Sequence, residues 1–139
     1  MLLIAASHSG LIASDEPTKP DPNDPALTAR GKVVYAEQCA SCHGANLEGQ
    51  PNWRKRLPNG RLPAPPHDAT GHTWHHSDRQ FFEMVKNGTA AMTPGCETDM
   101  PAYKDTLSDA DIWAVISFIE STWAPDIRER QGRMNHQNQ

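Results

Sequence analysis

The sequence is short of aromatic residues, cysteines and long hydrophobic runs. Aromatic residues make up 6% of its 139 residues and hydrophobic residues 37%. A chain of this length forms one domain, and so small a core usually needs a cross-link, a metal or a cofactor. No run approaches the about 20 apolar residues that a membrane-spanning helix requires. The net charge of −4 argues against nucleic acid as a partner.

The N-terminus lacks the basic residues with which a complete signal peptide begins. Residues 1–13 are largely apolar and contain no Lys or Arg. We interpret them as a signal peptide with a truncated start, or alternatively as an N-terminal arm. Residues 14–27 combine four prolines with four acidic residues. This composition resists helix and sheet and predicts an extended acidic linker.

Of the three cysteines, two lie three residues apart and are followed at once by a histidine: Cys39, Cys42 and His43. On one helical turn both sulfurs can reach the two vinyl groups of one porphyrin, and the histidine can bind the iron as its proximal ligand. A redox-active cysteine pair would need a strand–helix context that is not visible. A zinc site would need a second pair, and only Cys96 remains. The motif therefore predicts one covalently attached haem c.

Helical periodicity leads into this motif. Thr28 is a suitable N-cap for a helix that runs into Cys39. One stripe of that helix carries Gly31, Val34, Tyr35 and Gln38. Because glycine inside a helix costs about 1 kcal/mol relative to alanine, we expect Gly31 to permit a close crossing with another helix.

A second helix is predicted after Ser77. Gln80, three residues later, completes a capping box, and the helix would end at Asn87-Gly88. Phe82 and Val85 are expected to face the core.

The last main helix is predicted to begin at Ser108 and to end or restart at Pro125. Its buried stripe would be Ile112, Val115, Ile116 and Ile119. We expect Trp113 to meet Tyr35 across the Gly31 crossing. Residues 124–139 are interpreted as a polar C-terminal extension that contains one short surface helix.

Residues 45–71 form a long loop rich in glycine and proline, which a haem edge could organise. Histidines gather around Trp74: His67, His72, His75 and His76. They could form a second metal site or supply an alternative haem ligand, although their spacing fits no single helix face. We favour Trp74 as lining of the haem pocket, with its indole N–H bonded to a polar partner such as a propionate.

The residues Gly31, Tyr35 and Cys39-Ala40-Ser41-Cys42-His43-Gly44 resemble the N-terminal helix and haem motif of class I c-type cytochromes. The resemblance covers residues 28–123. It implies an all-α cytochrome c fold, with about four short helices and long loops around one covalently attached haem. In that family a proline carbonyl binds the second ring nitrogen of the proximal histidine. Pro63 or Pro65 could supply that carbonyl here.

The segment Met100-Pro101-Ala102-Tyr103 resembles the one that supplies the sixth iron ligand in those cytochromes, which implies that His43 and Met100 coordinate the iron. A thioether ligand raises the reduction potential. Met92 is a competing ligand, and a five-coordinate iron is the other alternative. Cys96 departs from the family pattern, and we expect a partly buried free thiol there.

The resemblance implies a periplasmic one-electron carrier that serves larger redox proteins and is not an enzyme. It implies export, because haem of this type is attached outside the cytoplasm, and membrane contact only if residues 1–13 are retained. No substrate pocket is expected. Three alternatives stay open: a haem enzyme or gas sensor with an open sixth position, a copper-handling module that uses the histidine cluster and Cys96, and a subunit of a larger redox complex, including a copper-linked one.

Overall fold

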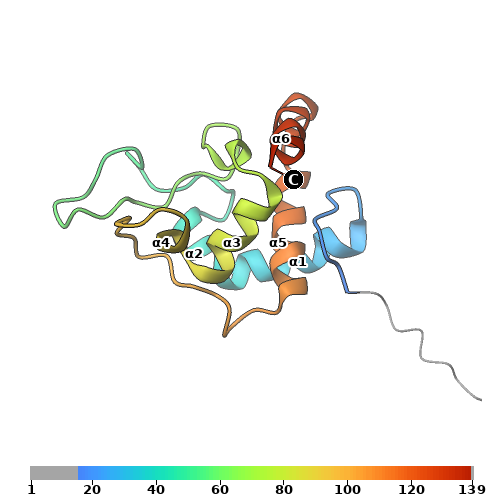
Figure 1. The fold of residues 1–139 in the computed structure, drawn as a ribbon, viewed down its shortest axis with the longest axis horizontal. Coiled ribbons are helices and arrows are strands. Elements are labelled where there is room, and N and C mark those ends of the chain that lie inside the picture. The colour runs from blue at the N-terminus through green and yellow to red at the C-terminus, as the bar shows by residue number, and fades with distance from the viewer. Residues whose placement is uncertain (1–15, 139) are drawn as a thin grey trace, which may run out of the picture.

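The structure, a computed structural model, describes residues 16–138. These residues contain no β-strand, and the all-α prediction is confirmed. The elements are α1 (Pro25–Gln38), α2 (Ala40–His43), the 3₁₀ turn η1 (Thr73–His75), α3 (Asp78–Asn87), α4 (Thr89–Met92), α5 (Asp109–Ser121) and α6 (Pro125–Gln137) (Figure 1). The predicted signal peptide, residues 1–13, lies outside the described residues. No helix within residues 16–138 is long and apolar enough to cross a bilayer.

Helix α1 begins earlier than predicted, at Pro25 rather than after Thr28. The N-cap is Asp24, whose carboxylate accepts the backbone N–H groups of Ala26 at 2.9 Å and Leu27 at 3.1 Å. Proline at the first helical position has no N–H to leave unsatisfied and a backbone angle already suited to a helix. Together an aspartate cap and a proline make a stronger start than threonine alone, so Thr28 lies inside the helix.

The predicted close crossing at Gly31 is confirmed, and its partner is α5. A Cβ atom on Gly31 would lie 1.9 Å from the carbonyl oxygen of Ala114 and 2.9 Å from the Cβ of Phe118. Only a residue without a side chain therefore allows the two backbones to approach this closely. In Figure 1, α1 passes across α5 near the middle of the molecule.

The aromatic partner predicted for Tyr35 is wrong. Phe118 meets Tyr35, with ring centroids 5.5 Å apart, whereas Trp113 stacks on Phe82 of α3 at 4.1 Å. Phe118 lies four residues after Ala114 and so shares the face that crosses α1. Trp113 is one residue before Ala114, which turns its side chain about 100° around the helix, toward α3.

Both predicted serine caps are confirmed. The Ser77 hydroxyl accepts the Gln80 N–H at 3.3 Å, and the Ser77 N–H donates to the Gln80 side chain at 3.0 Å. Ser108 and Asp111 form the same reciprocal arrangement at the start of α5. Helix α3 ends at Gly88, whose φ of 87° favours glycine.

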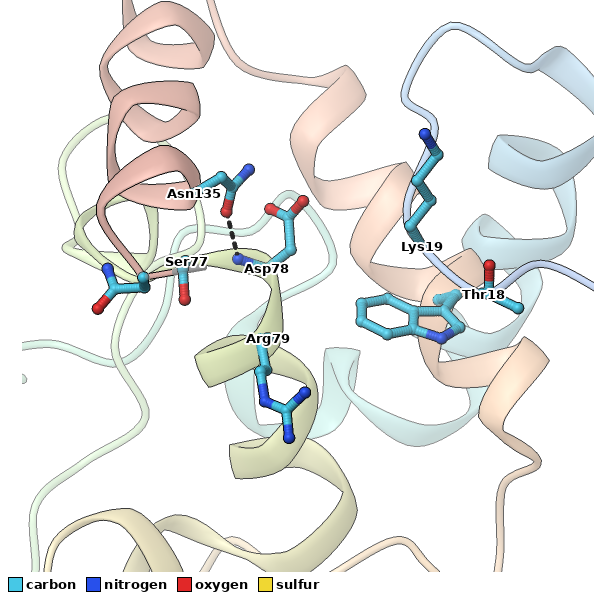
Figure 2. Close-up of a pocket in the computed structure, with 8 residues that line it drawn as sticks. Thr18, Lys19, Ser77, Asp78, Arg79 and Asn135 are labelled. Atoms are coloured by element: carbon cyan, nitrogen blue, oxygen red, sulfur yellow. Dashed lines mark hydrogen bonds between the residues drawn. The ribbon is translucent and has the colours of Figure 1, made fainter.

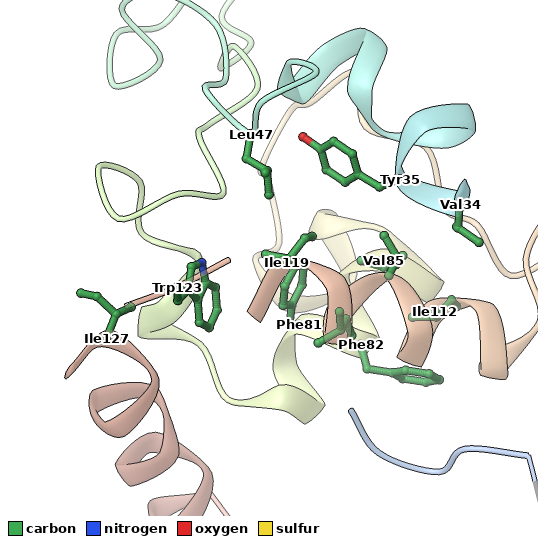
Figure 3. Packing of buried hydrophobic residues seen from close by; sticks show 12 residues of the cluster. Val34, Tyr35, Leu47, Phe81, Phe82, Val85, Ile112, Ile119, Trp123 and Ile127 are labelled. Atoms are coloured by element: carbon green, nitrogen blue, oxygen red, sulfur yellow. The ribbon is translucent and has the colours of Figure 1, made fainter. Parts of the chain in front are cut away.

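The core lies between α1, α3 and α5, and its residues are shown in Figure 3. The stripe predicted on α5 is buried throughout: Ile112, Val115, Ile116 and Ile119. Burying a side chain of this size contributes about 1.5–3 kcal/mol. The core thereby fixes α1, which carries the haem motif at its C-terminal end.

The two ends of the described chain pack onto this core. Pro20 is buried, and the backbone N–H of Asp21 donates to the Ser117 hydroxyl of α5 at 2.9 Å. Helix α6 is longer than the short surface helix predicted for the C-terminal extension, and it buries Ile127 and Gln131. Residues 20–21 and helix α6 therefore stabilise the domain by direct contact.

Candidate haem-binding site

The two motif cysteines lie on a single helical turn. Cys39 ends α1 and caps α2, and its carbonyl oxygen accepts the N–H groups of Cys42 at 3.1 Å and His43 at 2.9 Å. Both cysteines are free thiols; Cys39 is half-buried and Cys42 is exposed. The turn therefore presents two sulfurs and, directly after them, an imidazole.

The Cys39 thiol is a weak acid in the folded chain. Burial, together with the nearby Cys42, raises the pKa of the Cys39 thiol to about 11. Cysteines that exchange disulfides have lowered pKa values, because the thiolate is the reactive form. Cys39 is therefore protonated at neutral pH and is not itself an activated thiolate.

His43 is oriented by a hydrogen bond to Pro65. Its Nδ1 lies 2.8 Å from the Pro65 carbonyl oxygen. Because a carbonyl oxygen can only accept, Nδ1 carries the proton and Nε2 keeps the lone pair with which a metal is bound. Burial lowers the pKa of His43, which favours the neutral ring. Of the two candidate prolines, Pro65 is the one that meets the histidine.

A close approach between two loop segments holds Pro65 beside the histidine. The N–H of Gly49 donates to the His43 carbonyl at 2.7 Å, and Gly49 has a φ of +67°. A Cβ atom at this position would lie 2.4 Å from the backbone nitrogen of Pro66. Glycine is therefore required here both for the backbone angle and for the contact.

Met100 lies in a loop that is tied to two helices by Tyr103. The Tyr103 N–H donates to the Val85 carbonyl of α3 at 3.0 Å, and its hydroxyl donates to the Gln38 carbonyl at the end of α1 at 2.8 Å. Met100 is half-buried and packs against the core. Met92, the competing ligand, is 40% exposed. The packing favours Met100 as the ligand of the two, and its coordination stays a prediction.

An ion pair joins this loop to the loop on the histidine side. Arg61, in the long loop after α2, contacts Asp99 directly before Met100. The pair is largely exposed, so its contribution to stability is small. It nevertheless connects the segments that precede Pro65 and Met100.

Comparison with known families decides what kind of site this is. A model of the cytochrome c family matches residues 28–123. The chain belongs to the cytochrome c family. Cytochromes c are electron-transport proteins that bind haem c covalently, and the cofactor of this cytochrome is therefore haem c. Cys39, Cys42 and His43 have the residue types and spacing of the family's CxxCH motif.

The cytochrome is similar to several named proteins. It is 32% identical over 81 residues to cytochrome c-555 of Prosthecochloris aestuarii. That match covers 54% of this chain and 82% of the relative. It is 30% identical over 99 residues to the cbb3-type cytochrome c oxidase subunit CcoP of Azospirillum brasilense, and 33% identical over 110 residues to thiosulfate dehydrogenase of Stutzerimonas stutzeri (strain A1501).

The matches to the oxidase subunit and to thiosulfate dehydrogenase cover 70% and 78% of this chain. They cover 29% and 32% of those relatives, so the cytochrome spans under a third of their length. No solved structure matches the chain.

The histidine cluster of the sequence stays together only in part: the rings of His72 and His76 meet edge to face at 5.6 Å. His67 is buried, whereas His72 is exposed and stacks on Trp53 at 5.3 Å and His75 stacks on Trp74 at 3.8 Å. Among residues 16–138, no group of three or more His, Cys, Asp or Glu side chains could hold a metal ion. The copper-handling alternative therefore finds no support in the described part of the chain. Cys96 is half-buried, as expected.

Trp74 meets one requirement of its expected role. Its indole nitrogen is buried and has no hydrogen-bond partner. A buried N–H without a partner costs about 1–3 kcal/mol, so an acceptor supplied by a bound group would stabilise it. The haem propionate predicted for this position is such an acceptor, and the contact remains a prediction.

The sequence did not reveal the contact between His67 and His43. Their rings stack with centroids 4.1 Å apart and an angle of 27° between the planes. The only signal available was the position of His67 two residues after Pro65, one of the prolines considered as the partner of His43.

A groove elsewhere on the molecule is not part of the haem site. It lies between residues 18–19, the start of α3 and the end of α6, and the Asp78 N–H donates there to the Asn135 side chain at 2.7 Å (Figure 2). Its lining residues are Thr18, Lys19, Ser77, Asp78, Arg79, Trp113, Asn135 and Asn138. None of them belongs to the haem motif or to the Met100 loop.

Proposed function

We propose that this cytochrome is a one-electron carrier whose haem is attached to Cys39 and Cys42 and coordinated by His43 and Met100. The observation that carries the proposal is the hydrogen bond from His43 Nδ1 to Pro65, because it leaves Nε2 free to bind iron. The haem, when bound, supplies an iron that alternates between two oxidation states. The residues of the chain attach the haem, coordinate its iron and orient the ligands.

Each residue of the site has a separate task in this proposal. The two thiols hold the cofactor as thioethers. The Pro65 carbonyl orients His43 and raises the basicity of its ring, which strengthens it as a ligand of iron. Met100 supplies a thioether that raises the reduction potential. If His43 and Met100 both bound the iron, no coordination position would be left for a substrate, and we therefore propose that the protein is not an enzyme.

The proposed location is the periplasm, with membrane contact only through residues 1–13 if they are retained. The proposed partners are redox proteins that donate and accept single electrons. Support comes from the relatives, one of which is a subunit of a cbb3-type oxidase. Contacts of electron carriers are typically small and transient, so little of the surface needs to be specialised.

A haem enzyme is the second candidate, because one relative is a thiosulfate dehydrogenase. This function would require an iron with an exchangeable sixth position. Carbon monoxide would then bind the ferrous protein readily without any substitution. The electron-carrier proposal predicts slow or absent binding, because Met100 occupies that position.

Attachment is tested by producing the full chain in a host that attaches c-type haem, followed by haem staining after denaturation. The double variant Cys39→Ala, Cys42→Ala should lose the stain, because no thioether can form. Cys96→Ala is the matched control and should keep it. Stain that survives in the double variant, or disappears in Cys96→Ala, would contradict the proposed attachment.

A further inference from the structure

The imidazole of His43 is constrained on one of its faces by a second imidazole. The ring of His67 lies against it with centroids 4.1 Å apart and planes 27° from parallel. The hydrogen bond from His43 Nδ1 to Pro65 leaves the rotation of the His43 ring only loosely defined, because a carbonyl oxygen accepts over a broad range of directions. A flat ring at van der Waals distance is more restrictive, since rotation of His43 about its Cβ–Cγ bond would drive its edge into that ring.

His67 is itself held at several points. Its backbone N–H donates to the Leu47 carbonyl at 2.9 Å, and its carbonyl accepts the indole N–H of Trp123 at 2.7 Å. Its ring nitrogen Nδ1 lies 2.7 Å from the Thr73 hydroxyl, and the ring of Phe81 lies 5.7 Å away, centroid to centroid. The residue is 8% exposed, so these contacts are made in the interior.

The bond to Thr73 fixes the direction of the His67 ring. His67 Nδ1 and the Thr73 hydroxyl are 2.7 Å apart, and either can donate to the other, depending on the tautomer of His67. An aliphatic side chain of similar size would fill the same volume but would have neither a flat face nor this bond. The flat face determines which plane His43 adopts, and the bond to Thr73 adjusts the direction of that face.

We propose that His67 is a positioning residue that sets the rotation of the His43 imidazole plane, and hence the direction of that plane relative to the porphyrin. The inference rests on the proposed function, because it takes His43 as the proximal ligand. It adds a residue that acts on the iron only through the ligand.

The orientation of an axial imidazole has its own spectroscopic signature. In low-spin ferric haem the orientations of the two iron ligands together determine how the unpaired electron is distributed among the pyrroles, so a turned imidazole plane changes the distribution even when Met100 is unchanged. The order and spread of the haem methyl resonances in the NMR spectrum report that distribution. Loss of a merely structural contact would change stability but would leave this order unchanged.

The test uses the haem-loaded ferric protein and three variants. His67→Leu removes the flat face and the Thr73 bond, and should change the order of the methyl resonances. His67→Phe restores a flat ring and should return the order toward that of the wild type. His136→Leu is the control, because His136 is exposed on α6, away from the haem motif and the Met100 loop; it should match the wild type.

The wild-type order in His67→Leu would overturn the inference, as would the same altered order in His67→Leu and His67→Phe. If His67→Leu does not fold, the Thr73→Val variant provides the test. It frees the His67 ring without removing it, so the methyl spread should change, and an unchanged spread would overturn the inference. Failure of the proposed function is distinct, because the wild type itself would then show no histidine-ligated low-spin iron.

Discussion

A Cβ atom added to Gly31 would lie 1.9 Å from the carbonyl oxygen of Ala114. Gly31→Ala must therefore force α1 and α5 apart. Overpacking of this kind costs about 1–3 kcal/mol, and it outweighs the gain of at most about 1 kcal/mol in helix propensity. We expect a lower free energy of unfolding, measured by urea denaturation of the haem-loaded protein.

The matched control is Gly132→Ala in α6. A Cβ atom at this position would meet nothing within 4 Å. Alanine should therefore leave stability unchanged or raise it by up to about 1 kcal/mol. Equal stability of Gly31→Ala and the wild type would show that the crossing is not as close as described.

Tyr103→Phe should loosen the Met100 loop. The substitution removes the hydroxyl that donates to Gln38 at 2.8 Å, at a cost of about 0.5–1.5 kcal/mol. If Met100 is a ligand, its release becomes easier, and imidazole or cyanide should bind the ferric protein faster. Stopped-flow kinetics with either ligand measures this rate.

Tyr35→Phe provides the comparison for this experiment. It removes a similar hydrogen bond, from the Tyr35 hydroxyl to the Gly44 carbonyl at 2.7 Å, beside the haem motif rather than the Met100 loop. Its loss of stability should be similar, but ligand binding should keep the wild-type rate. Equal acceleration in both variants would mean that Tyr103 does not act through the Met100 loop.

Glu120 is a buried acid of α5 that makes stability depend on pH. It is 5% exposed and its Oε1 has no hydrogen-bond partner. Burial, with a further contribution from Asp78, raises the pKa of Glu120 to about 9, and Arg128 opposes this only in part. The folded protein therefore keeps a proton that the unfolded chain releases near its ordinary pKa of 4.5. The contribution of protonated Glu120 to stability is present in full at low pH and is lost as the pH rises toward about 9.

The free energy of unfolding should fall by up to about 1.4 kcal/mol per pH unit between about pH 7 and pH 9. Below this window the buried histidines act in the opposite direction, because their pKa values are lowered by burial. Glu120→Gln cannot ionise and should flatten the dependence, with its advantage over the wild type growing as the pH rises. Parallel curves for the two proteins in urea denaturation would contradict the buried charge.

Local signals in the sequence were sufficient for much of the fold. The capping box of Ser77 and Gln80 depends on residues three apart, and the stripe on α5 depends on one helical period, so both were predicted correctly. The start of α1 was missed because Thr28 and Asp24 are both good caps, and only the proline after Asp24 distinguishes them. The sequence could not show whether Phe118 or Trp113 meets Tyr35, because the crossing angle of the two helices decides which aromatic side chain faces α1.

The haem motif could be recognised in the sequence, but the contacts that support it could not. The motif from Cys39 to His43 is contiguous, so its chemistry can be read directly. The choice of Pro65 over Pro63 depends on the close approach of Gly49 and Pro66, which sets the path of the loop. The stacking of His67 on His43 follows from the same path, and no sequence periodicity encodes it.

The most direct test of the central claim is the optical spectrum of the haem-loaded ferric protein beside its Met100→Ala variant. We expect a low-spin wild type with the long-wavelength band of a sulfur-ligated haem. Met100→Ala should lose that band, become high-spin and bind cyanide readily, while Met92→Ala should match the wild type. An unchanged spectrum in Met100→Ala, or loss of the band in Met92→Ala, would contradict the proposed ligation.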